Sequence, residues 1–105
     1  GMGISSALFE EMVVDKGKVL NANLTDYRLS STGDIPSGDN MSSLTASAPQ
    51  RDGPFKAKGL AEGTLTPTAP AIANAIYNAV GVRIKDLPIT PEKVLKALKE
   101  SNKEP

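Results

Sequence analysis

The chain has 105 residues with no cysteine and no histidine, and its 12 basic and 12 acidic residues give a formal net charge of zero. The missing residue types exclude a disulfide framework, a zinc finger, a cysteine-ligated iron–sulfur cluster and catalysis by a histidine base. A zero net charge with 4% aromatic residues argues against a nucleic-acid-binding surface. No apolar run approaches the ~20 residues that cross a membrane, and no signal-peptide pattern opens the chain, so we expect a cytoplasmic protein.

The apolar pattern of the N-terminal part predicts one helix and one hairpin. Apolar residues at i, i+3, i+4 and i+8 from Ile4 share one face of a helix that we expect from residue 3 to about residue 12. Residues 13–20 are typical of two short strands joined by a turn at Gly17. A second extended stretch is expected within residues 21–36.

Two helices are predicted near the C-terminus. The first follows apolar residues from 69 to 80, with Pro70 near its start and Gly81 where a C-terminal cap glycine belongs. The second begins after Thr90, a suitable N-cap residue that a proline follows directly. Residues from about 99 to 105 form a polar segment, which we expect to be a flexible tail.

The middle of the chain is predicted to be a long irregular loop, because residues 30–54 are rich in Ser, Thr, Gly, Pro and Asp. Together the elements predict an α+β fold with an N-terminal helix, a small hairpin or sheet, this loop and two C-terminal helices. We treat residues 2–105 as a single domain and exclude Gly1 as a cloning scar.

Glu62 is the acidic residue with the most distinctive surroundings. It lies between Gly59 and Gly63, next to the small Ala61 and ahead of a predicted helix. Glycines let a backbone approach a ligand closely, and a carboxylate in a partly dry site can act as a general base. Spacing alone favours the interpretation that Glu62 is a solvated loop glutamate, and neither the Walker nor the Rossmann phosphate-binding pattern is present.

Six sequence blocks stand together in an order and spacing that is typical of one protein family. They are residues 7–11, 21–27, 34–36, 53–62, 70–76 and 87–94, the last followed by Ala97 and Leu98. With these blocks the chain resembles the C-terminal part of the molybdopterin-binding large subunit of the xanthine dehydrogenase, aldehyde oxidoreductase and aerobic carbon monoxide dehydrogenase family. The resemblance covers nearly all of the chain, and it is poor only over residues 37–50.

The resemblance implies a molybdopterin-type molybdenum cofactor and assigns roles to four residues. The family carries a Lys-Gly-x-Gly-Glu motif, whose glutamate deprotonates a water-derived oxygen that then attacks an electron-poor substrate carbon. By this resemblance Glu62 is the catalytic general base, and Lys58, Gly59 and Ala61 line the cofactor. Ala61 and Lys56 stand where the family has glycine, so strain is expected if the Ala61 position requires a positive φ.

The resemblance also implies partners, because the family's large subunit is several times longer than this chain. They are the rest of a large subunit together with iron–sulfur and flavin subunits. We therefore expect a C-terminal fragment or split piece of a molybdenum hydroxylase that is inactive alone. Apolar surface left exposed predicts a homo-oligomer. The alternative is a stand-alone, non-enzymatic remnant or interaction module that keeps the fold without the cofactor.

Overall fold

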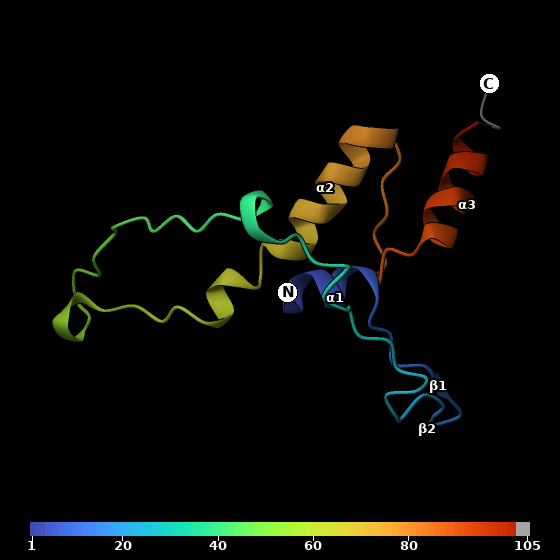
Figure 1. Cartoon of the computed structure of the whole chain (residues 1–105), viewed down its shortest axis with the longest axis horizontal. Coiled ribbons are helices and arrows are strands. Elements are labelled where there is room, and N and C mark those ends of the chain that lie inside the picture. The colour runs from blue at the N-terminus through green and yellow to red at the C-terminus, as the bar shows by residue number, and fades with distance from the viewer. Residues whose placement is uncertain (103–105) are drawn as a thin grey trace.

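The computed structural model describes residues 1–102 and shows a group of helices from which one long segment projects (Figure 1). We call residues 37–65 the arm, and the three helices with the linker at residues 81–90 the helical body. The radius of gyration is 18.0 Å, whereas a compact domain of this length has about 13 Å. The elements in chain order are α1 (Met2–Leu8), β1 (Val14–Asp15), β2 (Lys18–Val19), the short 3-10 turns η1 (Gly38–Asn40), η2 (Pro54–Lys56) and η3 (Glu62–Thr64), α2 (Thr68–Val80) and α3 (Pro91–Ser101).

Helix α1 packs against α2 through a close approach at Gly3. A Cβ atom built on Gly3 would lie 2.6 Å from the Cβ of Thr68, so the two helices can come this near only because position 3 is glycine. The linker joins the same group, because the backbone N–H of Ile89 donates to the carbonyl of Ala7 at 2.7 Å. These contacts hold α1, α2 and the start of α3 together.

Helix α1 is shorter than predicted, since it ends at Leu8 rather than near residue 12. The side chain of Asn21 explains the difference. Its Oδ1 accepts from the N–H of Val13 at 2.9 Å, and its Nδ2 donates to the carbonyl of Glu11 at 2.6 Å. These bonds draw the segment after α1 into the base of the hairpin, where side chain–backbone hydrogen bonds replace the next helical turn.

The predicted hairpin is confirmed. Strands β1 and β2 pair antiparallel, with Val14 opposite Val19. The turn residues Lys16 and Gly17 have φ of 46° and 80°. Positive φ at both central positions is the type I′ geometry that matches the twist of a two-residue hairpin.

The prediction of a second extended stretch within residues 21–36 is wrong, because turns occupy this part of the chain. The Oδ1 of Asn23 accepts from the N–H of Thr25 at 2.9 Å, and the carbonyl of Asn23 accepts from the N–H of Tyr27 at 2.8 Å. An asparagine that binds the backbone two residues ahead favours a turn over a strand. The turn places the Tyr27 hydroxyl 2.7 Å from Oε2 of Glu10, to which it donates.

The two predicted C-terminal helices are confirmed with their caps. Gly81 follows α2 with a φ of 75°, and its N–H donates to the carbonyl of Tyr77 at 2.8 Å. Thr90 precedes α3, and its Oγ1 accepts from the N–H of Lys93 at 3.4 Å. These are the satisfied helix ends that a cap glycine and a cap threonine provide.

The start of the expected C-terminal tail needs correction. The tail was predicted from about residue 99, but α3 remains helical to Ser101. Residues 103–105, which complete the predicted tail, lie outside the described residues.

The apolar core is thin. Within residues 1–102, the buried apolar side chains are Ala7, Val82, Pro88 and Ile89. Phe55, on the arm, is fully exposed at 103%. Because burial of apolar surface stabilises a fold by about 25 cal/mol per Å², the arm contributes little to the stability of this chain. None of the helices in the described part of the chain is long and apolar enough to span a membrane.

Candidate functional site

The four predicted site residues follow one another on the arm, where it returns toward α2. Lys58 and Gly59 lie in irregular backbone, Ala61 precedes η3, and η3 begins at Glu62. All four residues are exposed. Their proximity therefore comes from their nearness in sequence, and packing by another element does not enclose them.

The backbone at Ala61 does not require glycine. Its φ of −65° and ψ of −69° lie in the right-handed helical region, so its methyl group is not strained in this conformation. Positive φ values occur instead at Phe55 and Lys56, with 52° and 60°. Lys56 is the other position at which the resemblance leads one to expect glycine. The left-handed conformation costs a residue with a side chain about 1–2 kcal/mol.

A tight turn holds the backbone of Glu62. Its carbonyl accepts from the N–H of Leu65 at 3.0 Å, and the hydroxyl of Thr64 donates to the carbonyl of Ala61 at 2.7 Å. Among residues 1–102, no hydrogen bond or ion pair engages the Glu62 carboxylate.

The surroundings of Glu62 fit one wall of a cofactor site. A Cβ atom built on Gly59 or Gly63 meets nothing within 4 Å, so a ligand can approach the backbone at both positions. In the described part of the chain, the backbone N–H groups of Lys58, Gly59 and Leu60 donate to no protein acceptor, which leaves them available to a ligand. Open backbone, free donors and an unpaired carboxylate are compatible with one wall of a ligand site, and no other element of residues 1–102 encloses them.

A group of His, Cys, Asp or Glu side chains that could by itself hold a metal ion is not found within residues 1–102. Ala61 instead lines a hollow of about 230 Å³ between η3 and the N-terminal half of α1. Gly3 and Ile4 contribute from the α1 side. The sequence contains no signal for this hollow, because it depends on how α1 packs beside α2.

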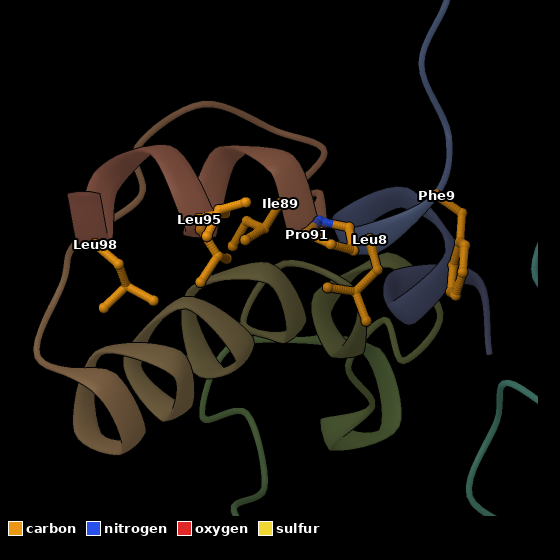
Figure 2. Close-up of a pocket in the computed structure, with 7 residues that line it drawn as sticks. Leu8, Phe9, Ile89, Pro91, Leu95 and Leu98 are labelled. Carbon is orange, nitrogen blue, oxygen red and sulfur yellow. The ribbon is translucent and has the colours of Figure 1, made fainter. Parts of the chain in front are cut away.

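An apolar groove of about 450 Å³ lies on the helical body, between the end of α1 and α3 (Figure 2). Figure 2 shows Leu8 and Phe9 at one end of the groove and Leu98 at the other. Leu95, which lies between them, remains 53% exposed. The lining residues are Leu8, Phe9, Ile89, Pro91, Val94, Leu95 and Leu98. The apolar spacing of α3 was visible in the sequence, but its pairing with α1 was not.

Comparison with known proteins identifies relatives of this chain. No protein-family model matches the sequence. The chain is 40% identical over 96 residues to the putative xanthine dehydrogenase molybdenum-binding subunit XdhA of Escherichia coli, which is 90% of this chain and 12% of that subunit. It is also 40% identical over 99 residues to the aldehyde oxidoreductase molybdenum-binding subunit PaoC of Escherichia coli, covering 92% of this chain and 13% of that subunit.

A solved structure is also similar to this chain. Quinoline 2-oxidoreductase from Pseudomonas putida matches with a TM-score of 0.76 and 27% identity, over 94% of this chain and 13% of that chain. The chain thus spans 12–13% of the length of the relatives it matches. It is homologous to one segment of the molybdenum-binding subunits of xanthine dehydrogenases and aldehyde oxidoreductases.

Proposed function

We propose that this chain serves as the C-terminal segment of a molybdenum hydroxylase large subunit and supplies the general base Glu62 and one wall of the cofactor site. The observation that carries the proposal is the unpaired, exposed carboxylate of Glu62 between two open glycines, in a chain homologous to molybdenum-binding subunits. The substrate class is a compound with an electron-poor carbon.

The residues of the arm have distinct roles in this proposal. The molybdopterin-type cofactor, when bound, supplies the two-electron redox centre. Glu62, the first residue of the η3 turn, accepts the proton of the attacking water-derived oxygen at its carboxylate. Gly59 lets the backbone approach the cofactor, and Lys58 offers a positive charge. The free backbone N–H groups of residues 58–60 donate hydrogen bonds to the cofactor beside this charge.

Exposed apolar surfaces support the proposal that this chain has partners. The apolar groove between α1 and α3 and the exposed apolar side chains of the arm present surface that the rest of a large subunit would cover. Iron–sulfur and flavin subunits are the proposed further partners, and a cytoplasmic location is the proposed compartment. In the isolated chain the same surfaces favour a homo-oligomer.

The general-base role is tested by Glu62→Gln in the assembled enzyme, with Glu11→Gln as the control. The amide keeps the size of the side chain but cannot accept the proton, so kcat should fall about 10²–10⁴-fold with KM and molybdenum content unchanged. Glu11 is exposed on the segment after α1 and lies outside both proposed sites, so its substitution should leave kcat unchanged. A loss in kcat below about tenfold for Glu62→Gln would contradict the proposed base.

Molybdenum content separates this proposal from its alternative. The chain, tagged and isolated from its native cell, should carry near-stoichiometric molybdenum and co-purify with larger chains. A chain without molybdenum and without larger partners would instead be the stand-alone remnant or interaction module, and Glu62 would have no catalytic role.

A further inference from the structure

A cationic hollow of about 370 Å³ lies at the far end of α2 from Glu62, between the linker and α3. Four cationic and two acidic side chains line it, so its local charge is positive although the whole chain is neutral. Its charged lining residues are Arg83, Lys85, Asp86, Lys93, Lys96 and Glu100. Ile84 and Ala97 supply the apolar part of its wall.

Two contacts from α2 hold Arg83 in place. One guanidinium nitrogen, Nη1, donates to Oδ1 of Asn74 at 2.9 Å. The guanidinium also lies over the ring of Tyr77, with 4.0 Å between its central carbon and the ring centroid. A guanidinium stacked and bonded in this way loses little further freedom when its remaining N–H groups bind a ligand.

One lysine of the hollow bonds to the backbone of its wall, and the other two have ammonium groups that a ligand can engage. The ammonium of Lys93 donates to the carbonyl of Pro88 at 2.9 Å and so braces the wall. Lys96 approaches Glu100 only at 4.0 Å, and both side chains are largely exposed, so this pair neutralises little charge. Lys85 forms no hydrogen bond or ion pair among residues 1–102.

We propose that this hollow binds a small multiply charged anion of the phosphate type. The guanidinium N–H groups of Arg83 that Asn74 does not engage can donate charge-assisted hydrogen bonds to phosphate oxygens, and Lys85 and Lys96 can neutralise the remaining charge. The volume lies within the roughly 300–1,000 Å³ that is typical of small-molecule sites. A neutral or cationic ligand would leave these cations uncompensated.

The hollow is separate from the proposed catalytic residue. Glu62 precedes α2, and Arg83 follows it (Figure 1). The 13 residues of α2 extend over about 20 Å, because an α-helix rises 1.5 Å per residue. Anion binding here therefore does not depend on the role of Glu62, and the two proposals can fail independently.

The test is a calorimetric titration of the full chain with inorganic pyrophosphate, with citrate as a carboxylate comparison. We expect saturable binding of pyrophosphate that weakens as salt rises, and clearly weaker binding of citrate. Arg83→Gln should weaken pyrophosphate binding by about tenfold or more. Lys99→Gln removes the same charge from α3 outside the lining of the hollow, and it should change affinity less than about twofold.

Three results would overturn the proposal: no saturable binding at low salt, equal losses in Arg83→Gln and Lys99→Gln, or citrate bound as tightly as pyrophosphate. Helical circular dichroism should show that both variants fold. If Arg83→Gln loses helix, Lys96→Gln takes its place. Lys96 has a largely exposed side chain, and its distant pair with Glu100 is its only ion pair or hydrogen bond among residues 1–102. Unchanged affinity in Lys96→Gln would then contradict the assignment.

Discussion

The helical body and the arm are two regions of one chain that are held in different ways. The body is joined by contacts between elements that are distant in sequence, such as the approach of Gly3 to Thr68 and the bond from Ile89 to Ala7. The arm is held by turns of a few residues, such as the bond from the N–H of Ala57 to the carbonyl of Pro54 at 3.0 Å. The proposed catalytic segment lies on the region that this chain does not itself pack.

This difference has an energetic consequence. Ordering one residue costs about 1–2 kcal/mol of backbone entropy, which burial of apolar surface must offset. The body offsets part of that cost at Val82 and Ile89, whereas Leu44 and Phe55 on the arm remain exposed at 94% and 103%. The exposed apolar side chains of the arm are what the proposed cover by a partner would bury.

Ile89→Ala and Leu44→Ala compare the two regions most directly, and the first should have the largest effect. Ile89 is 3% exposed, so its truncation should lower the free energy of unfolding by about 2–5 kcal/mol. Leu44→Ala should change it by less than about 0.5 kcal/mol. Urea denaturation followed by circular dichroism measures both, and similar losses in the two variants would show that the arm packs as the body does.

Gly3→Ala and Gly63→Ala make the same comparison with a single methyl group. At Gly3 the added carbon would lie 2.6 Å from Thr68, so α1 and α2 must move apart, at a cost of about 1–3 kcal/mol. At Gly63 it would meet nothing within 4 Å, and the free energy of unfolding should stay within about 0.5 kcal/mol. Thermal denaturation is the measurement, and an unchanged midpoint in Gly3→Ala would contradict the close approach.

Tyr27→Phe should have the smallest effect on the free energy of unfolding, and the dependence of this effect on pH identifies its cause. Hydrogen bonds from the Ser5 and Tyr27 hydroxyls hold the pKa of Glu10 below its usual value. The bond to Glu10 also raises the pKa of Tyr27. The stabilisation from Glu10 is present above about pH 4.3 and is lost as the pH falls through its lowered pKa. The stabilisation from Tyr27 is present below about pH 10 and is lost as the pH rises through its raised pKa.

The measurable consequence is a stability difference between wild type and Tyr27→Phe that is greatest near neutral pH and shrinks toward both extremes. Urea midpoints at a series of pH values measure it. Tyr77→Phe is the matched control, because the Tyr77 hydroxyl donates no hydrogen bond among residues 1–102, and its difference should not follow this profile. A difference for Tyr27→Phe that stays constant from acid to alkali would exclude the Glu10 contact.

The sequence determined the elements whose signals act within a few residues. Gly17 predicted the hairpin turn, Gly81 the end of α2 and Thr90 the start of α3, because each signal concerns the backbone of its own neighbours. The homologous family could also be named from ordered blocks of residues. The proposed site segment from Lys58 to Glu62 was found in the same way, because its members are consecutive.

Tertiary structure decided what depends on residues distant in sequence. The end of α1 was predicted wrongly because Asn21, outside the helix, captures the backbone at Glu11 and Val13. The groove between α1 and α3 and the cationic hollow were not predicted, because each exists only after separate elements meet. Periodicity shows which face of a helix is apolar, but only the packed chain shows what that face meets and which charges gather beside it.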